Sequence, residues 1–448
     1  MDQGAKGMKA LPLWVGSLWL STSCVISWWI WAQSAAGLSA DAPLQLQIFK
    51  AVGLGLWMAA GWFWFARVPP RHAMWSILIG ATLVRALLLT VDPLLSDDLW
   101  RYLWDGEVQR QGYSPYGVAP ADEALDDVAA SADWQGVRDR INHPQIPTVY
   151  PPAAQFAFRF FAFGADSWRC WMIMADLAVG VLLCRLLLRK GWDLRRSIFW
   201  CWHPLPILES AIGGHLHLLA VLLLAVALMY IEGRQRWQGA GFLSLATSTL
   251  LVPAGLMFHM LKKLGWQSGG IFFAVLAATT MFFIFEWHPN TADGWGSYAG
   301  SWYSGGLLLE PLGRLLGVNV YDAGDPWTRG IRSGLVGAWW FLAWAVRNLE
   351  TWRATRILML GFLLLTPTLH PWYALWLLLP TIISPSPGAF LLTLTVLLNY
   401  RVLDSWRGAG VWEFPPGTTA WVFTLPLLFL FVEAVQALRR GVSTPAKE

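Results

Sequence analysis

Apolar residues form long, nearly uninterrupted segments along most of the chain, and polar residues collect in the stretches between them. Such segments recur from Leu11 to Leu438. A helix needs roughly 20 mostly apolar residues to cross the hydrocarbon core of a bilayer. No soluble domain of ordinary size fits between the segments. The pattern therefore predicts an all-α, polytopic membrane protein in which residues 1–448 form one domain.

Composition agrees with this prediction. The 448 residues are 56% hydrophobic and only 13% charged, with a mean hydropathy of +0.45, which is too apolar for a water-soluble globule of this length. The 32 tryptophans fit a membrane protein, because indole rings favour membrane–water interfaces. Cys24, Cys170, Cys184 and Cys201 lie in apolar segments without CxxC spacing. We expect them to be small core residues rather than disulfides or metal ligands.

The basic residues predict the orientation of the chain. Arg67 and Arg71 lie between helices expected at about residues 46–66 and 73–92, and a basic block follows a helix expected at about 167–188. Basic residues collect in cytoplasmic loops. The long segment 93–166 between these two loops is therefore expected on the outer, periplasmic face of the inner (plasma) membrane.

Counting the apolar segments gives about twelve transmembrane helices, the first an uncleaved helix at residues 11–32. Residues 239–261 are an exception, because basic stretches that both belong inside flank them. A break near Pro253 would turn this segment into a re-entrant hairpin. Residues 150–165 begin with prolines and continue apolar, which predicts a short interfacial helix. Both termini are then cytoplasmic.

Four polar segments are expected to share the outer face. They are residues 93–166, 287–332, 369–373 and 400–418. Loops longer than about 12–15 residues without secondary structure are uncommon unless they are functional. The arrangement predicts a site at the membrane surface.

The first of these segments contains "SDDLWRYLWDGEVQRQGYSPYGVAP" at residues 96–120. Asp97 and Asp98 directly follow the third predicted helix, and a carboxylate there can act as a general base. The alternative is an acidic pair that solvates a helix end. Asp97 and Arg101 are spaced for an i, i+4 ion pair, which would leave Asp98 to face the cavity.

Arginines on the outer face run against the positive-inside tendency. A guanidinium matches the oxygens of a phosphate, so these side chains could clamp an anionic headgroup. Pairing with the neighbouring aspartates is the alternative for any one of them. The arginines in question are Arg101, Arg110, Arg138, Arg140, Arg401 and Arg407.

Ionisable groups also occur inside the apolar segments, where they are costly and need partners. Arg85 and Asp176 are expected to neutralise each other. "ESAIGGHLH" places Glu209, His215 and His217 near the outer surface, around two glycines that break the apolar pattern. Two histidines without a clear third ligand do not predict a metal site. The chain also lacks GxGxxG, Walker and HExxH patterns, and nothing in it points to nucleic acid.

Four motifs together resemble the bacterial GT-C glycosyltransferases, in particular the polyprenyl-phosphate-mannose-dependent mannosyltransferases. They are "SDDLWRYLWDGEVQRQGYSPYGVAP", "HPQIPTVYPPAAQ", "WHPLPILESAIGGH" and "LLLTPTLHPWYALWLLLP", and they occur in the expected order over residues 96–380. The combination is specific to the family but not to one sugar or acceptor.

The resemblance implies a multi-helix membrane fold with a catalytic aspartate, matching Asp98, with Asp97 adjacent. It implies transfer of a sugar, mannose or another hexose, with inversion, from a polyprenyl-phosphate donor to a lipid or glycan acceptor. No metal or cofactor is implied. The candidate substrate-binding residues are Arg101, Tyr102, Asp105, His143, Tyr150, His215, His217, His370, Trp372, Tyr373 and Arg401.

The chain departs from the family pattern at two places. His217 stands where relatives usually carry an acid, and "STLLVP" lacks the lysine common before the proline. Both departures concern substrate identity or activity rather than architecture. A transporter or flippase of lipid-linked glycans and an inactive scaffold relative are the alternatives. Transporters often show internal repeats, and this chain has no convincing one.

Overall fold

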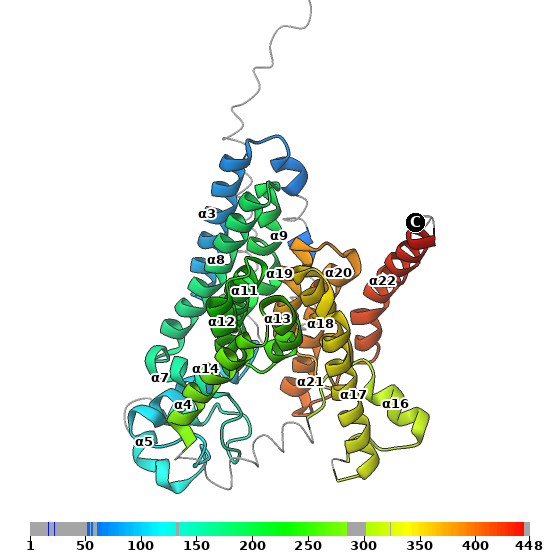
Figure 1. Cartoon of the computed structure of the whole chain (residues 1–448). Coiled ribbons are helices and arrows are strands. Elements are labelled where there is room, and N and C mark those ends of the chain that lie inside the picture. The colour runs from blue at the N-terminus through cyan, green and yellow to red at the C-terminus, as the bar shows by residue number, and fades with distance from the viewer. Residues whose placement is uncertain are drawn as a thin grey trace, which may run out of the picture.

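The computed structural model describes residues 61–130, 134–284, 302–322 and 324–442, together with Ser17, Thr22 and residues 52, 53, 55 and 56. Every regular element in these ranges is a helix (Figure 1). The predicted all-α class is therefore confirmed. The helix predicted at residues 11–32 and most of the one at 46–66 lie outside the described residues.

In the first half of the chain, two long helices flank a segment of shorter ones, and further helices follow the second long helix. The elements are α3 Pro70–Leu88, α4 Asp98–Arg110, η1 Glu123–Leu125, α5 Asp126–Ala130, α6 Trp134–Arg138, α7 Pro152–Phe161, α8 Ala165–Arg189, η2 Leu194–Ser197, α9 Ile198–Cys201, α10 Pro204–Ala211, α11 His217–Glu232, α12 Arg236–Thr249, η3 Val252–Leu256, α13 Met257–Leu264 and α14 Gln267–Ile284.

The second half repeats this mixture of long helices and short turns. The elements are α16 Leu309–Leu316, α17 Pro326–Ala345, η4 Val346–Asn348, α18 Thr351–Leu365, η5 Pro371–Ala374, α19 Leu375–Ile383, α20 Pro387–Thr395, η6 Val396–Arg401, α21 Val402–Ala409 and α22 Thr418–Val442. The helix predicted at 150–165 is confirmed in α7, which has Pro151 as its N-cap and Pro152 as its first residue.

Among the described residues, two helices are long and apolar enough to cross a membrane, α8 over Ala165–Arg189 and α22 over Thr418–Arg439. Shorter apolar helices occur at His217–Glu232, Gln267–Phe283 and Pro371–Ile383. The expected helix at 167–188 is thus confirmed within two residues at each end. A count of about twelve crossings stays a prediction.

A buried ion pair holds the first helices together. Arg85 Nε of α3 donates to Asp176 Oδ2 of α8 at 2.6 Å, and neither side chain is exposed. Trp200 Nε1 and Ser210 Oγ also donate to this carboxylate, at 2.8 and 2.9 Å. These bonds join α3, α8, α9 and α10. They also offset the cost of burying the two charges, since a buried charge needs a partner and further hydrogen bonds. The predicted Arg85–Asp176 pair is confirmed.

The predicted break near Pro253 is also present. Helix α12 ends at Thr249, Leu250 is extended, and the chain resumes as η3 and α13. Arg236 Nε at the start of α12 donates to the carbonyl of Leu264 at the end of α13, at 3.0 Å. The two ends of the segment therefore lie side by side, as the ends of a hairpin do.

Large apolar side chains are exposed along the sides of the long helices. On α3, Trp75, Ile79 and Leu83 are 59%, 56% and 49% exposed and lie four residues apart, on one helix face. Helix α22 exposes a similar set, Trp421, Leu425, Leu427, Leu428, Phe429, Phe431, Val432 and Leu438. Exposed apolar surface of this extent marks contact with a partner or a membrane.

The cysteines only partly follow the prediction. Cys184 and Cys201 are buried, but Cys170 is exposed, because its side chain lies on the outward face of α8. All three are free thiols. Cys24 lies outside the described residues.

The polar segments meet at one end of the molecule. Helices α4, α5 and α21 lie at the lower end in Figure 1, whereas the C-terminus lies well above them. Arg407 of α21 donates to the carbonyl of Leu94, and the amide of Leu369 donates to the carbonyl of Ser304 at 2.6 Å. The expected gathering of these segments is confirmed for their described parts, and residues 287–301 lie outside them.

Candidate active site

Asp98 is the first residue of α4, and its carboxylate lies in a largely enclosed position. Its side chain is 21% exposed, and its backbone amide donates to Ser96 Oγ at 3.1 Å. A negative charge is favoured in the first turn of a helix. Burial raises the pKa of Asp98, while His215 nearby and the hydroxyls of Tyr150 and Tyr102 limit the rise. A base with a raised pKa and limited access to water suits proton abstraction.

The surroundings of Asp97 differ from those of Asp98. The residue is exposed, and it precedes α4 without capping it. Partial burial of its carboxylate raises the pKa of Asp97, and the guanidinium of Arg407 opposes the rise. Asp97 therefore faces Arg407, and the predicted ion pair with Arg101 is wrong.

Arg101 pairs instead with Asp105. Its Nε donates to Asp105 Oδ1 at 2.8 Å, and its Nη1 donates to the carbonyl of Ile146 at 3.0 Å. Asp105 also accepts from Thr148 Oγ1 at 2.5 Å and Gln155 Nε2 at 3.0 Å. Both side chains tie α4 to the segment before α7. The prediction that Asp105 binds substrate is not supported by this geometry, because its oxygens are occupied and 1% of the residue is exposed.

His215 links Asp98 to a second, fully buried carboxylate. Its Nε2 lies 4.0 Å from Asp98 Oδ2, and its Nδ1 lies 2.7 Å from Glu209 Oε2. The hydroxyl of Tyr400 donates to both oxygens of Glu209, at 2.8 and 2.9 Å. His215 and Glu209 have no exposed side-chain surface. Three segments thus place an imidazole between two carboxylates.

Two glycines make this arrangement possible. The backbone amide of His215 donates to the carbonyl of Glu209 at 2.9 Å, so the chain turns tightly between α10 and α11. A Cβ on Gly213 would lie 2.4 Å from His215 Nδ1, and Gly214 has a φ of 61°. Only glycine meets both conditions without strain. The break in the apolar pattern at "IGGH" therefore positions the imidazole.

The turn at residues 370–373, with the sequence HPWY, packs directly against His215. Trp372 lies between two imidazoles, stacked on His215 with 4.0 Å between ring centroids and on His370 with 4.5 Å. Burial and His215 lower the pKa of His370 to about 3, so its ring is neutral. The predicted proximity of this turn to Asp98 is confirmed. Trp372 cannot present a free ring face to a sugar, because both faces are covered.

His217, Tyr373 and Trp376 form the adjoining wall. His217 stacks on Tyr373 with 5.3 Å between centroids and meets Trp376 edge-on at 5.9 Å. The rings of His215 and His217 are 6.4 Å apart. The structure therefore brings His217 and Tyr373 into the cluster around His215.

Tyr102 and Tyr150 complete the opposite wall. Their rings are 5.1 Å apart, edge to face, and Tyr102 also stacks on Phe158 of α7 at 4.8 Å. Burial raises the pKa of both tyrosines well above 10, and Asp98 adds to the rise, so both hydroxyls keep their protons. The Tyr102 hydroxyl, which has no hydrogen-bond partner in the described structure, is a donor available to an acceptor or to a sugar.

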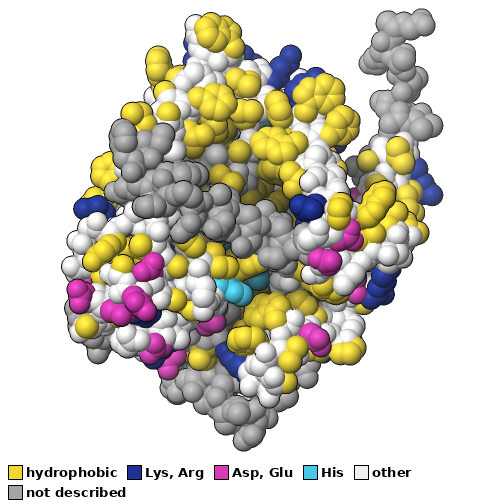
Figure 2. All heavy atoms as spheres, turned by 90° about the horizontal axis from the view of Figure 1, so that it is seen from below, with side chains coloured by type: hydrophobic (Ala, Val, Ile, Leu, Met, Phe, Trp, Pro, Cys, Tyr) yellow, Lys and Arg dark blue, Asp and Glu magenta, His cyan; other side chains and the backbone are white. Residues whose placement is uncertain are grey.

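Several buried polar atoms in this cluster have no hydrogen-bond partner within the described ranges. They are the hydroxyl of Tyr102, both ring nitrogens of His215, whose approach to Glu209 is not aligned for a hydrogen bond, Nδ1 of His217 and Nε1 of Trp376. Native proteins rarely leave such atoms unsatisfied, and those that do occur call for a water, an ion or a ligand. Their concentration around Asp98 is the feature expected of a binding site. Figure 2, a view from the lower end, shows histidine side chains near the centre of this face with acidic side chains close by.

Of the two remaining predicted residues, His143 lies apart from the cluster and Arg401 lies at its edge. His143 is exposed and has a positive φ of 52°, and its ring lies 5.0 Å from that of Trp302. No contact joins it to Asp98. Arg401 closes η6 beside Tyr400, and its buried Nε has no hydrogen-bond partner in the described structure.

The sequence did not identify Tyr400 and Trp376 as site residues, and it indicated Glu209 only as a charge in need of a partner. The signal for Glu209 was its place six residues before His215, across the glycine pair. Tyr400 had no local signal, because its partner is far away in the sequence. Within the described residues, no group of three or more His, Cys, Asp or Glu side chains has a geometry that could hold a metal ion.

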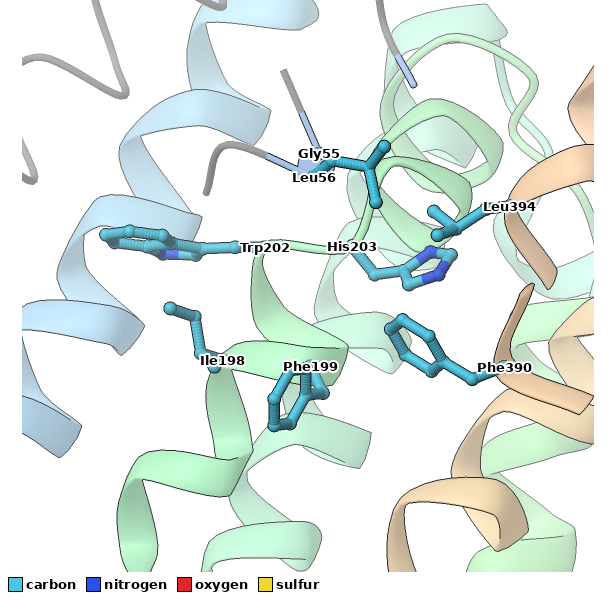
Figure 3. Close-up of a pocket in the computed structure, with 8 residues that line it drawn as sticks. All are labelled: Gly55, Leu56, Ile198, Phe199, Trp202, His203, Phe390 and Leu394. Carbon is cyan, nitrogen blue, oxygen red and sulfur yellow. The ribbon is translucent and has the colours of Figure 1, made fainter. Parts of the chain in front are cut away.

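A small pocket lies at the start of α10 (Figure 3). His203 caps α10 by accepting from the amide of Leu205 at 3.2 Å, and its other nitrogen lies 3.1 Å from Thr393 Oγ1. With both nitrogens engaged, the pocket is essentially apolar. Its lining residues are Gly55, Leu56, Ile198, Phe199, Trp202, His203, Phe390 and Leu394.

The comparisons with known proteins add no family to this picture. No protein-family model matches the chain, and no curated protein matches it.

Proposed function

We propose that the protein is an inverting glycosyltransferase that moves a sugar from a polyprenyl-phosphate donor to a lipid or glycan acceptor. The observation that carries the proposal is the position of Asp98, a carboxylate of raised pKa at the rim of a cluster rich in unpaired donors. The resemblance of the four motifs to the GT-C family supplies the reaction class.

The reaction needs one base and one stabilised leaving group. Asp98 takes the proton of the acceptor hydroxyl as the hydroxyl oxygen attacks the anomeric carbon. The bond between that carbon and the phosphate oxygen breaks, and the lipid phosphate leaves with the electron pair. Attack opposite the leaving group inverts the anomeric configuration. A phosphate leaves as a stable anion, so a strong general acid is not required.

An arginine is expected to meet the charge on the departing phosphate. Arg110 and Arg138 are committed to internal carboxylates and carbonyls. Arg101 Nη2 and Arg401 Nε are buried and have no hydrogen-bond partner in the described structure. We therefore assign the phosphate contact to Arg101 and Arg401.

We further propose that the protein crosses the membrane many times, with Asp98 on the outer face. Support comes from the exposed apolar side chains of α3 and α22 and from the two helices of spanning length. Asp98 lies at the end of the molecule that carries the acidic segments, whereas the basic block after α8 lies at the opposite end of that 25-residue helix. This polarity follows the positive-inside tendency.

Purified protein in liposomes tests the function. Polyprenyl-phosphate mannose with a labelled sugar is supplied together with an extract of bacterial envelope lipids and glycans. We expect label to move to an acceptor, with inversion. Movement of intact labelled donor between leaflets without transfer would indicate a flippase, and neither result in the presence of correctly folded protein would indicate a scaffold.

A further inference from the structure

Glu209 and His215 form a pair that the proposed transfer reaction does not yet use. Glu209 lies in α10 and His215 in the turn before α11, and both side chains are completely buried. A buried carboxylate needs a cation or several hydrogen bonds to offset its desolvation. Tyr400 supplies one bifurcated hydrogen bond to the two oxygens, and the imidazole Nδ1 at 2.7 Å is the only basic partner within ion-pair distance in the described structure.

The orientation of the imidazole gives the pair a direction. Nδ1 faces Glu209, which leaves Nε2 directed toward Asp98 Oδ2 at 4.0 Å. Trp372 covers one face of the ring and prevents it from swinging away. The Nδ1 contact is not aligned for a hydrogen bond, but the negative charge of Glu209 at 2.7 Å favours a proton on Nδ1 and leaves Nε2 as the proton acceptor.

The other titratable groups around His215 do not compete for this role. His217 lies 6.4 Å away between ring centroids, and His370 lies on the far side of the Trp372 ring. The hydroxyl of Tyr400 is bonded to Glu209, and that of Tyr102 lies beside Asp98. Asp98 and Glu209 are the carboxylates within ion-pair distance of the imidazole in the described structure, and Arg169, which lies beside Gly214, is bonded to Asp166 and to backbone carbonyls.

We propose that Glu209 and His215 accept the proton that Asp98 removes from the acceptor, an inference that rests on the proposed transferase function. Asp98 takes the proton from the hydroxyl, and His215 Nε2 then takes it from Asp98. Asp98 returns to a carboxylate, His215 becomes an imidazolium, and Glu209 balances its charge. The proton leaves to solvent after the products depart. The 4.0 Å gap closes by a small side-chain movement or by one water, since such distances are often long without substrate.

The proposed proton path predicts opposite shifts in the pH dependence of kcat for two variants. Turnover requires a neutral His215, so the acid limb of the profile reports protonation of the coupled Asp98–His215 unit. Glu209→Gln removes the charge that favours the imidazolium, which moves the limb to lower pH and reduces the plateau at least about tenfold. Tyr400→Phe leaves the charge but removes its hydrogen-bond donor, so the carboxylate favours the imidazolium more strongly and the limb moves to higher pH.

The experiment measures transfer from polyprenyl-phosphate mannose by the full-length protein in liposomes between about pH 5 and pH 9, a range that brackets histidine titration. Glu232→Gln is the matched control, since this carboxylate pairs with Lys190 and Trp352 far from Asp98. The control should leave the limb in place. Thermal unfolding and gel filtration establish that each variant is folded.

The outcomes separate this inference from the function on which it rests. Opposite displacements of the acid limb in Glu209→Gln and Tyr400→Phe support the proton path. An unmoved limb in both variants, with an active wild type, overturns the proton path and leaves the transferase function intact. A folded wild type that transfers no sugar overturns the function itself. If Glu209→Gln fails to fold, Tyr400→Phe alone decides by the direction in which its acid limb moves.

Discussion

Trp372 stacks on His215 with 4.0 Å between ring centroids and 19° between the ring planes, although the two residues are far apart in the sequence. His370 stacks on Trp372 at 4.5 Å and 8°. Two nearly parallel rings so close to one indole lie on opposite faces of it. Trp372 is therefore a support that holds His215 toward Asp98, rather than a platform for a sugar.

This role predicts which kinetic constant responds to a change at Trp372. Trp372→Phe keeps an aromatic ring against His215 and should retain most of kcat. Trp372→Leu removes the stacking, worth about 0.5–1.5 kcal/mol, and should lower kcat roughly three- to tenfold. The KM for the lipid-linked sugar should stay unchanged in both variants. A rise in KM with constant kcat would show that the indole contacts the substrate after all.

Asp98 and Asp97 should differ sharply in their effect on turnover. Positioned general bases typically contribute about 10²–10⁴-fold, so Asp98→Asn should reduce kcat by a factor in this range. Asp97 is exposed and faces Arg407, so Asp97→Asn should cost less than about tenfold. Transfer assays on the two purified variants check the assignment. Near-normal transfer by Asp98→Asn would remove Asp98 from the mechanism.

Asp98→Asn should also stabilise the protein at neutral pH. Burial raises the pKa of Asp98 above 3.8, so the native carboxyl binds its proton more tightly than the unfolded chain does. The free energy of unfolding therefore falls as pH rises from 3.8 through the native pKa, and it stays lower above that pKa. Each tenfold difference in proton affinity between the native and the unfolded carboxyl lowers it by about 1.4 kcal/mol.

Asp98→Asn removes this ionisation penalty. In thermal unfolding experiments in detergent, the Tm of Asp98→Asn minus the Tm of the wild type should be larger at about pH 7.5 than at about pH 4.5. Asp126→Asn is the control, because that carboxylate is 65% exposed. A Tm difference that is the same at both pH values would mean that Asp98 is not destabilised by ionisation.

Local sequence patterns predicted the helical elements well. The prolines at the start of α7, the apolar length of α8 and the proline after the end of α12 are local signals that act within a turn or two of helix. The Arg85–Asp176 pair was also predictable, because two opposite charges in otherwise apolar segments have few alternatives to each other.

Side-chain partners at the site were less predictable. Arg101 has an aspartate four residues away on either side, and sequence spacing cannot choose between them. Asp105 is buried beside Thr148 and Gln155, whereas Asp97 stays exposed, where an ion pair contributes little. Likewise, the bond between Glu209 and Tyr400 depends on how α10 packs against the segment after α20, which no local pattern records.

The buried position of Asp105 predicts a structural phenotype. Asp105→Asn leaves the buried Arg101 guanidinium without its counter-charge, which should cost about 3–5 kcal/mol. Asp126→Asn breaks the partly exposed pair with Arg138 and should cost about 0–1 kcal/mol. Chemical denaturation in detergent measures both. An Asp105→Asn protein of normal stability and reduced donor affinity would restore Asp105 to substrate binding.

The proposed orientation can be read from two cysteines at opposite ends of the molecule. Glu123 is exposed in η1, near the acidic segment that follows α4, and Gln235 is exposed between α11 and α12 beside Arg234 and Arg236. The native cysteines are first replaced by serine, since Cys170 is exposed. In intact spheroplasts, Glu123→Cys should react with a membrane-impermeant maleimide, because the loops that flank residues 93–166 are basic and therefore cytoplasmic. Gln235→Cys should react only after lysis. The reverse pattern would place Asp98 in the cytoplasm, and labelling of both cysteines in intact cells would contradict a membrane between them.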